Sequence, residues 1–597
     1  MNTMKKIMHK TAAAALLALL VSCDSFLSKE PIAELGADTY FTNEKSLQLY
    51  ADGFLQEMMP SAETLFQGDC WSDLVATRNS TDYLTVPWSS SRQTGWSYSN
   101  WYDLFNVNYF LKHMYEVSGV REETLKHYEG VARFWRAWFY YGKVRTFGAV
   151  PWYDEPIDAE DDAALYKTRD SREYVMRKVL EDLDFACTYC STASAYTQTA
   201  QIDKWKALAF KSRVCLFEGT YRKYHTVDPS TGQPWTSDES EVYLRACADA
   251  CEELMSDGPY SLVSTPSGVQ TQYRSLFISE ELNRQEIIWG REYSTSLGIY
   301  HTATWVFTSP TQSRWSMTRA LADMYLNLDG SRFTDKENHD ELPFVDETAG
   351  RDYRMMQSIV TPGYMKEVAG EKVLTAPDMS VSLTGYQLIK WCFDDDLHSG
   401  TRSNNSLSIL RYAEVLLNYA EAMAELNGGI LEPSVWERTI KPLRERAGVV
   451  GTQPQTADPY LASYYKVQSK DLLEIRRERA VELLLENLRY DDLMRWHEGE
   501  LTKRVWQGIY IPAVGTPIDL NGDGQNDLCV INSDTGSENG VYYIDLRDGS
   551  YTLTGGTSGL LQYNLDRIWE EKMYLRPIPR TATGINPALG QNYGWAD

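Results

Sequence analysis

The fold is decided by SILRYAEVLLNYAEAMAELNGG (408–429) and DLLEIRRERAVELLLENLRYDDLMRW (471–496), two stretches whose apolar residues have helical spacing. In the first stretch, apolar side chains recur at steps of three and four, and a row of alanines beside them lets another helix approach closely. Gly428 and Gly429 end this pattern, as glycine commonly does after a helix. The two stretches therefore predict a pair of packed helices.

The second stretch is unusually rich in charge. Asp471 is placed to cap its first turn, with Glu474 three residues later, as in a capping box. Further charges lie three or four residues apart, at Arg476, Arg477, Glu478, Arg479, Glu482, Glu486 and Arg489. One interpretation is a solvated face with weak ion pairs, or a structural ion network, and the other is a catalytic pair of carboxylates. Because pattern alone seldom identifies catalysis, we prefer the first interpretation.

The composition is that of an acidic chain of 597 residues with a formal net charge of −25. Its 18 Trp and 39 Tyr suit either core packing or a surface that stacks against a ligand, because each side chain combines a flat apolar face with a polar tip. The negative charge argues against nucleic acid as a partner, because phosphate groups would be repelled. The excess of acid is instead typical of an exported protein that must stay soluble.

Residues 1–22 have the features of an export signal, with a basic start and an apolar run too short to span a bilayer. The run ends in Leu20-Val21-Ser22-Cys23, which resembles a bacterial lipobox. That resemblance implies cleavage before Cys23 and attachment of a diacylglycerol and an acyl chain to the new N-terminus, which together hold a protein durably on a membrane. The alternative is ordinary cleavage that leaves a free cysteine.

The remaining cysteines are scattered along the chain, unlike those of a disulfide-dense scaffold. Cys187 and Cys190 form a C-x-x-C motif, but the sequence has no second such motif or nearby histidine pair to complete a zinc site. We therefore expect most of these cysteines to be small buried side chains.

After a tether at 23–37, the chain is predicted to form one domain over 38–597. Helical spacing predicts a scaffold, mainly at 38–58, 100–256 and 408–497. The spacing fades at 60–99 and 260–405, where Trp and Tyr lie among Gly, Ser, Thr and Pro, and β-prone runs separated by turns follow at 505–570. Because long ordered loops on a rigid frame usually carry binding, we expect the ligand site in the two loop regions.

A set of short motifs runs from the lipobox to the C-terminus. They are CDSFLSKEP (23–31), RFWRAWFYY (133–141) with FGAVP (147–151), LRYAEVLL (410–417), LRERAG (443–448), ERAVELLLE (478–486) with Arg489 and DLMRW (492–496), and PIP (577–579) with Asn586-Pro587 and Gln591-Asn592. Each motif is weak alone. In this order and spacing, however, they resemble the SusD/RagB family of Bacteroidetes surface lipoproteins.

The resemblance implies a mainly α-helical fold, in which tetratricopeptide-like helix pairs form a scaffold with long irregular loops and short β-hairpin insertions. It also implies a protein anchored by lipid to the outside of the outer membrane, beside a SusC-like TonB-dependent transporter. Members of the family capture oligosaccharides, or in some cases peptides, and no catalysis is implied. Because the loop regions vary among members, the resemblance assigns no residue that contacts a ligand.

Sugar capture needs flat apolar faces for the C–H side of the ring and polar groups for its hydroxyls. The loop regions offer that mixture, and we predict a ligand site formed by Trp71, Asp73, Trp88, Trp96, Tyr300, Trp305 and Trp315. The alternative for each loop tryptophan is a place in the core. A protein that hands its ligand on must also release it, so we expect a dissociation constant of about micromolar to millimolar.

The sequence DLNGDGQND (519–527) has the ligand spacing of a short calcium loop. Its predicted Ca²⁺ ligands are Asp519, Asn521, Asp523, Gln525 through its backbone carbonyl, and Asp527. Val530 replaces the bidentate glutamate of an EF-hand, and the flanks favour strand rather than helix. We therefore predict a structural Ca²⁺ site in a hairpin, and the alternative is a solvated acidic turn.

The sequence contains no lipase-type serine motif, no zinc-protease motif and no nucleotide-binding glycine loop. We rank first a non-catalytic surface protein that binds oligosaccharide. A peptide- or other nutrient-binding protein on the same scaffold comes second. A secreted glycoside hydrolase comes last, because its two carboxylates can come from anywhere in a chain and leave no motif.

Overall fold

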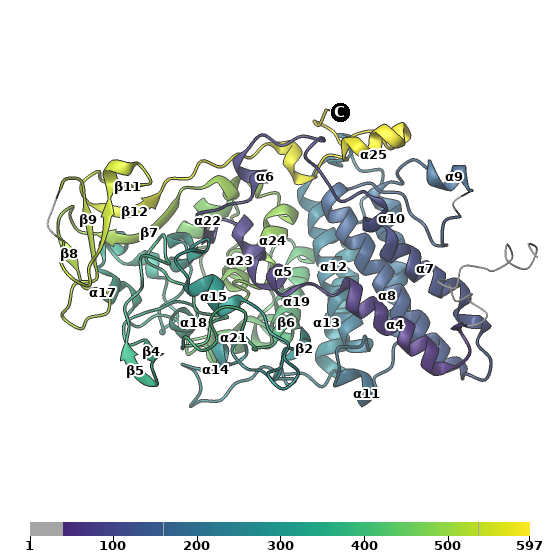
Figure 1. The fold of residues 1–597 in the computed structure, drawn as a ribbon, viewed down its shortest axis with the longest axis horizontal. Helices are drawn as coiled ribbons and strands as arrows, with labels where there is room; N and C mark the ends of the chain where they lie inside the picture. The colour runs from purple at the N-terminus through teal and green to yellow at the C-terminus, as the bar shows by residue number, and fades with distance from the viewer. Residues whose placement is uncertain (1–39, 159, 535–536, 597) are drawn as a thin grey trace, which may run out of the picture.

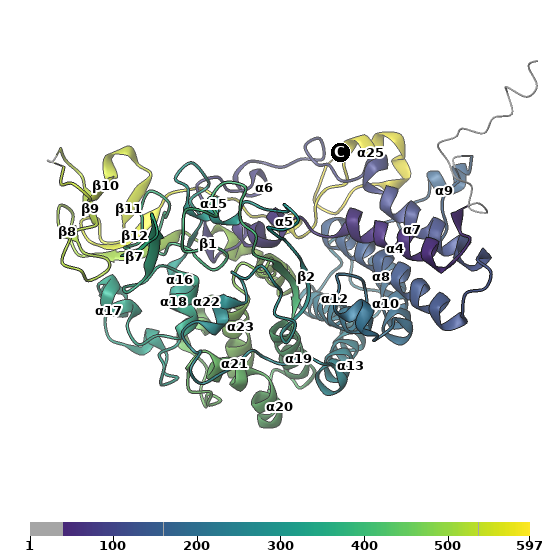
Figure 2. The same cartoon turned by 60° about the horizontal axis from the view of Figure 1, so that its bottom comes forward.

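The computed structural model describes residues 40–158, 160–534 and 537–596. Figures 1 and 2 both show the long helices gathered in one half of the molecule, with loops and small sheets in the other half. The predicted export signal (1–22) and the predicted tether (23–37, including the lipidation site Cys23) lie outside the described residues. Within the described ranges, every helix is too short or too polar to cross a membrane.

Long helices pack in pairs that follow one another along the sequence. Helix α8 (Glu122–Phe147) lies against α10 (Arg172–Tyr189), and α12 (Lys204–Tyr224) lies against α13 (Ser240–Asp257). The second pair is especially close, because a Cβ added at Gly219 would lie 2.8 Å from a leucine side chain of α13. Packed helix pairs of this kind confirm the predicted mainly α-helical scaffold.

The remaining helices extend or flank these pairs. Helices α4 (Glu44–Met58) and α7 (Tyr102–His113) both contact α8 (Figure 2). The shorter helices lie in loops and at the ends of longer elements: α5 (Ala62–Gln67), α6 (Asp82–Thr85), α9 (Asp162–Leu165), α11 (Ser194–Thr197), α14 (Gln272–Ser275), α15 (Ala303–Thr308), α16 (Arg319–Ala322), α17 (Phe344–Thr348), α18 (Tyr353–Ser358), α20 (Pro433–Arg438), α21 (Ile440–Arg446), α22 (Pro459–Tyr465) and α25 (Arg580–Ile585).

A continuous hydrophobic core joins the helical pairs to the rest of the molecule. It includes Trp135 of α8, Trp289 and Leu410 of the sheet that lies beside them, and Leu473 further along the chain. The described cysteines, from Cys70 onwards, are all buried and free, which confirms the expectation for most of them.

The first of the two deciding stretches begins as a strand. Residues Leu407–Arg411 form β6, which pairs antiparallel with β2 (Ile287–Arg291), and helix α19 (Tyr412–Leu426) starts only after it. The prediction of helix at 408–411 is therefore wrong. The reason is that β2, far earlier in the chain, supplies hydrogen-bond partners that the spacing of apolar residues does not reveal.

The second stretch is divided into two helices, α23 (Lys470–Glu482) and α24 (Arg489–Arg495). In the turn between them, Leu485 has a φ of 60°, which no right-handed helix contains. The buried carboxylate of Asp69 accepts hydrogen bonds there from the backbone N–H groups of Leu485, at 2.5 Å, and Arg489, at 3.3 Å. One continuous helix is therefore a wrong prediction, because a distant side chain satisfies the amides that the break exposes.

Ser469, rather than Asp471, caps helix α23. The Oγ of Ser469 accepts a hydrogen bond from the N–H of Leu472 at 3.1 Å. The Asp471 carboxylate instead accepts from the backbone N–H of Leu431 and from the side chain of Gln453, at 3.1 and 2.9 Å. The predicted capping role of Asp471 is therefore wrong, and its side chain joins the helix to the loops beside it.

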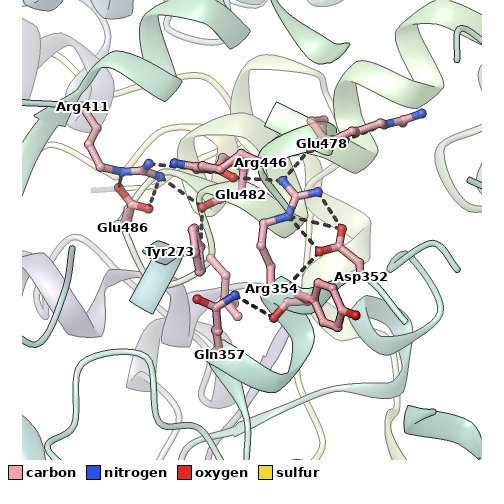
Figure 3. Close-up of polar contacts among 12 residues, drawn as sticks. Tyr273, Asp352, Arg354, Gln357, Arg411, Arg446, Glu478, Glu482 and Glu486 are labelled. Carbon is pink, nitrogen blue, oxygen red and sulfur yellow. Dashed lines mark hydrogen bonds and ion pairs between the residues drawn. The ribbon is translucent and has the colours of Figure 1, made fainter. Parts of the chain in front are cut away.

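The charges of α23 belong to a buried ion network, in which Figure 3 shows three arginines directed at Glu482. The Glu482 carboxylate lies 2.9 Å from Arg354 Nη1 and 2.8 Å from Arg411 Nη1, and it also pairs with Arg446. Burial opposes ionisation of this carboxyl, but the three arginines hold its pKa well below the usual value. Removing one partner would leave an uncompensated buried charge, at a cost of about 3–5 kcal/mol.

This network decides between the interpretations of the charged stretch. Arg476, Arg477 and Arg479 are buried together with the carboxylates, so the solvated face is wrong and the structural ion network is confirmed. Glu478 pairs with Arg354 and Arg444, and Glu486 pairs with Arg411 and Lys390. Because these carboxylates are bound to cations inside the protein, they do not form a catalytic pair facing a substrate.

Two small sheets occupy the end of the molecule away from the long helices, as Figures 1 and 2 both show. Both come from the predicted β region at 505–570. One sheet has the order β11 (Tyr551–Leu553), β12 (Gly559–Tyr563), β7 (Trp506–Ile511), and the other has the order β10 (Tyr542–Asp545), β9 (Leu528–Ile531), β8 (Pro517–Ile518). The separate hairpin β4 (Met365–Val368) and β5 (Glu371–Leu374) lies in the second predicted loop region.

Two long-range contacts bring distant loops together. Strand β1 (Val75–Ala76) pairs antiparallel with β3 (Ser316–Met317), which joins the loop at 60–99 to the second predicted loop region. The C-terminal segment returns to the end of α8, where the N–H of Arg576 donates to the carbonyl of Thr146 at 2.7 Å. The first loop, α8 and the C-terminal segment therefore share one face of the scaffold.

Candidate functional site

A groove of 1080 Å³ opens between the loop at 60–99, helices α8 and α24, and the C-terminal segment. Its aromatic lining includes Trp71, Trp88, Trp138, Phe139, Phe147 and Tyr490. Amide and charged side chains lie among these rings, including Gln67, Gln93, Asn100, Lys143, Asn487, Asp491 and Arg576. Flat apolar faces next to hydrogen-bonding groups are what a polyhydroxylated ring requires, so the groove is a candidate site for such a ligand.

Trp71 and Trp88 are the two predicted ligand residues that line the groove. Both are half-buried, and both are held by a neighbour. The Trp71 ring stands edge-on to Tyr490, with 5.8 Å between ring centroids, and the Nε1 of Trp88 donates to Gln93 Oε1 at 2.9 Å. Because their orientations are already fixed, little side-chain entropy would be lost when a ligand stacks on them.

Trp96 supports the wall of the groove from behind. Its ring packs edge-on against Trp101 and Phe147, with centroid separations of 5.3 and 5.0 Å, and Phe147 itself lines the groove. Trp96 is therefore placed beside the site, and direct contact between its indole and a ligand stays a prediction.

Asp73 and Trp315 require correction. Asp73 is 2% exposed, and its carboxylate accepts from Arg489 Nε at 2.9 Å, from Arg489 Nη2 at 2.7 Å and from Tyr464 Oη at 2.6 Å. Trp315 is 7% exposed and packs against Phe307, with 5.2 Å between ring centroids. Both side chains hold their loops in the core, so neither is available to a ligand in this structure.

Tyr300 and Trp305 lie close to the groove but do not line it. Tyr300 is 39% exposed and Trp305 is half-buried. Thr302, between them in sequence, places its Oγ1 at 3.5 Å from Glu63 Oε1, and Glu63 belongs to the groove lining. The second loop region therefore borders the site, and ligand contact by these two aromatic residues stays a prediction.

The C-terminal segment contributes a residue to the groove that was not predicted from the sequence. The guanidinium carbon of Arg576 lies 3.3 Å from the ring centroid of Tyr83, 5.0 Å from that of Trp71 and 5.8 Å from that of Trp88. Arg576 directly precedes the PIP motif at 577–579, one of the family-like motifs of the C-terminal segment. Its distance in sequence from the loop at 60–99 gave no indication that the two would meet.

At another part of the groove, acidic groups lie beside a lysine. Burial raises the pKa of the Asp103 carboxyl, and the nearby Glu57 carboxylate raises it further. Burial lowers the pKa of Lys143 to about 8, although Asp103 opposes this effect. The Nζ of Lys143 donates to the carbonyl of Gly95 at 2.8 Å. These groups can donate and accept hydrogen bonds at the wall of the groove.

The predicted calcium loop joins β8 and β9 as a hairpin, so its strand flanks are confirmed. The Asp519 carboxylate accepts hydrogen bonds from the N–H groups of Gly522 and Gly524 at 2.7 and 2.8 Å, and Asp527 accepts one from Leu520 at 2.7 Å. In the part of the chain that the structure describes, no group of three or more His, Cys, Asp or Glu is placed to hold a metal ion. Binding of Ca²⁺ by this loop therefore stays a prediction.

Two family models match this chain. One, described as the SusD family, matches residues 285–595, which is more than half of the sequence. The chain belongs to the SusD family. The other model is described as "Starch-binding associating with outer membrane" and matches residues 26–216 of the same SusD-family chain. Together the matches confirm the resemblance found in the sequence motifs.

Individual relatives are distant. SusD-like protein P25 of Formosa agariphila is 21% identical over 295 residues, which is 46% of this chain and 50% of P25. SusD-like protein P2 of the same organism is 22% identical over 511 residues, which is 82% of this chain and 91% of P2. The solved structure of a SusD-like carbohydrate-binding protein from Bacteroides fragilis is 19% identical, covers 92% of this chain and 100% of that chain, and has a TM-score of 0.65. At such identities the structural likeness establishes the fold alone.

Proposed function

We propose that this SusD-family protein captures an oligosaccharide in the groove and holds it without turnover. The observation that carries the proposal is the lining, where the indole rings of Trp71 and Trp88 lie among amide and charged side chains in a cavity of 1080 Å³. The family description as starch-binding, and the carbohydrate-binding relative from Bacteroides fragilis, support the same class of ligand.

The bound oligosaccharide is then passed to a SusC-like TonB-dependent transporter in the outer membrane. Lipid attached to Cys23 keeps the protein on the cell surface beside this partner. The sequence resemblance and a family description that names the outer membrane support this part of the proposal. Transfer requires release, which agrees with a binding free energy of about −8 to −4 kcal/mol.

Replacing Trp71 or Trp88 with alanine tests the site. Each variant should weaken oligosaccharide binding roughly tenfold, or about 1.4 kcal/mol, because one stacking face is lost. The measurement is isothermal calorimetry of the signal-free protein against a panel of polysaccharides. Tyr166→Ala is the control, because Tyr166 is 51% exposed and lies outside the groove lining. Unchanged affinity in both tryptophan variants would place the binding site elsewhere.

The alternative functions give different results in the same preparation. A glycoside hydrolase would release reducing ends from a soluble glycan, and Asp103 with Glu57 is the carboxylate pair of the groove in which one pKa is raised. Turnover that disappears in Asp103→Asn would favour this alternative. A peptide-binding member of the family would leave the polysaccharide panel blank and bind peptides instead.

A further inference from the structure

Unlike Arg145 and Arg489, Arg576 has no anionic partner among the described residues. Arg145 forms an ion pair with Asp491, and Arg489 is held by Asp73 at 2.7 Å. Arg576 lines the groove and is half-buried, and among the described residues no carboxylate lies within ion-pairing distance of its guanidinium. A half-buried cation that faces a cavity without a counter-charge is an incomplete site, because its desolvation is compensated only in part.

The neighbours of Arg576 hold it by stacking. Its guanidinium carbon lies 3.3 Å from the ring centroid of Tyr83, with Trp71 at 5.0 Å and Trp88 at 5.8 Å. These cation–π contacts fix the plane of the guanidinium but occupy none of its N–H donors. The donors are therefore free to form hydrogen bonds with a ligand that stacks on either indole.

Two of the acidic residues that line the groove also border a second pocket, which Arg576 does not line. Glu57 and Asp103 line both the groove and a neighbouring pocket of 310 Å³ that is formed largely by α4 and α7. Lys143 lies near this pair, because the Asp103 carboxylate raises the pKa of Lys143 against the effect of burial. Arg576 instead lies among Tyr83, Trp71 and Trp88. Arg576 and this acidic pair therefore have different neighbours in the groove.

We propose that the groove selects glycans with an anionic substituent, a uronate carboxylate or a sulfate ester, and that Arg576 binds this substituent while the sugar ring stacks on Trp71 or Trp88. The planar guanidinium presents two parallel N–H groups, which match the paired oxygens of either anion. This inference names the ligand class of the proposed function and rests on it.

The net charge of −25 does not oppose this selection. A nucleic acid carries a charge about every 1.7 Å of duplex, so it would meet the whole acidic surface at once. An acidic glycan brings isolated charges to one point of the groove. At physiological ionic strength, charges more than about 8 Å away are largely screened, and the local cation then decides the interaction.

The test compares charged glycans with neutral forms of the same backbone. Calorimetry of the signal-free protein would use oligogalacturonate and its methyl ester, a sulfated glycan and its desulfated form, and a panel of neutral polysaccharides. A charged form that the protein binds should bind at least about tenfold more tightly than its neutral counterpart, because charge-assisted hydrogen bonds are lost on neutralisation. The uronate and sulfate pairs distinguish the two sources of the anion.

Variants at Arg576 show whether this residue causes the preference. Arg576→Gln should abolish the difference between charged and neutral forms, and Arg576→Lys should retain part of it. Arg580→Gln is the matched control, because it removes the same charge from an exposed residue nearby in the chain. Trp88→Ala should instead weaken the charged and neutral forms to a similar extent, because it removes the stacking face.

The possible outcomes separate this inference from the proposed function. Binding of neutral polysaccharides with equal or weaker binding of charged forms would overturn the role of Arg576 and leave the proposed function standing. A charge preference that survives Arg576→Gln would also overturn it. If no glycan of either kind binds, the proposed function fails, and the inference fails with it.

Discussion

Asp69 links the loop that carries Trp71 to the turn between α23 and α24. Its carboxylate is fully buried, and it accepts hydrogen bonds from the N–H groups of Leu485 and Arg489. Burial raises the pKa of Asp69 to about 7, although these two donors and the charge of Lys390 act in the opposite direction. In an unfolded chain the same carboxyl titrates near pH 4. Between these values, the folded protein retains a proton that the unfolded chain releases.

The substitution Asp69→Asn tests this linkage. Because the raised pKa lets the folded state bind more protons, wild-type stability relative to the variant should be greatest below about pH 4 and fall as the pH rises to about 7. Urea unfolding of both proteins between about pH 4 and pH 8 measures the difference between their free energies of unfolding. The other titrating groups are the same in both proteins, so their contributions cancel in this difference. A difference that is flat, or that grows with pH, would mean that the two N–H donors outweigh burial and keep the carboxylate ionised.

Single residues were predictable where local sequence sets their environment. Trp71 and Trp88 lie among polar residues in a long loop, and both line the groove. Asp73 and Trp315 have equally polar neighbours in sequence, but Arg489 and Phe307 draw them into the core. Arg576 could not be predicted as part of the site, because only the folded chain brings it to Tyr83.

The 519–527 hairpin loop carries a prediction at the scale of a single element. If this loop binds Ca²⁺ through Asp519, Asp523 and Asp527, the folded state gains about 2.7 kcal/mol at a hundredfold excess of Ca²⁺ over the dissociation constant. Adding Ca²⁺ to chelator-treated protein should therefore raise the melting temperature. Asp519→Asn should remove the increase, and Asp534→Asn should retain it, because the Asp534 side chain is 96% exposed and lies outside the loop. No shift in the wild type would leave a solvated acidic turn as the correct interpretation.

Elements were predictable where helical spacing and local stop signals agree. Helix α8 (Glu122–Phe147) lies within the predicted helical region 100–256, and Gly148 with a φ of 72° ends it. The segment 408–411 has similar spacing, but pairing with β2 makes it a strand. The break after α23 was hidden for the same reason, since Asp69 lies in a loop far from it in sequence. In both cases a partner distant in sequence overrides the local pattern.

The whole molecule combines a scaffold held by a buried ion network with a groove assembled from segments that lie far apart in the sequence. The ion network around Glu482 ties α18, β6, α21 and α23 to one another. The groove is formed by a loop near the N-terminus, the C-terminal segment and residues of several scaffold helices, α8 and α24 among them. Because the network is internal, the loops that form part of the groove wall can change without disturbing it.

The proposed lipid anchor makes a prediction for the whole protein in the cell. Cys23→Ser removes the acceptor for the diacylglycerol and the N-terminal acyl chain, so the protein should move from the membrane fraction to the soluble fraction and lose labelling with radioactive palmitate. Its affinity for a glycan in solution should stay unchanged, because the groove is built from residues well beyond the tether. Ser25→Ala is the control, since it changes a neighbouring polar residue and leaves the lipidated cysteine in place. A Cys23→Ser protein that still sediments with membranes after a high-salt wash would contradict the anchor, and delivery to a transporter would then require a contact made by the folded domain itself.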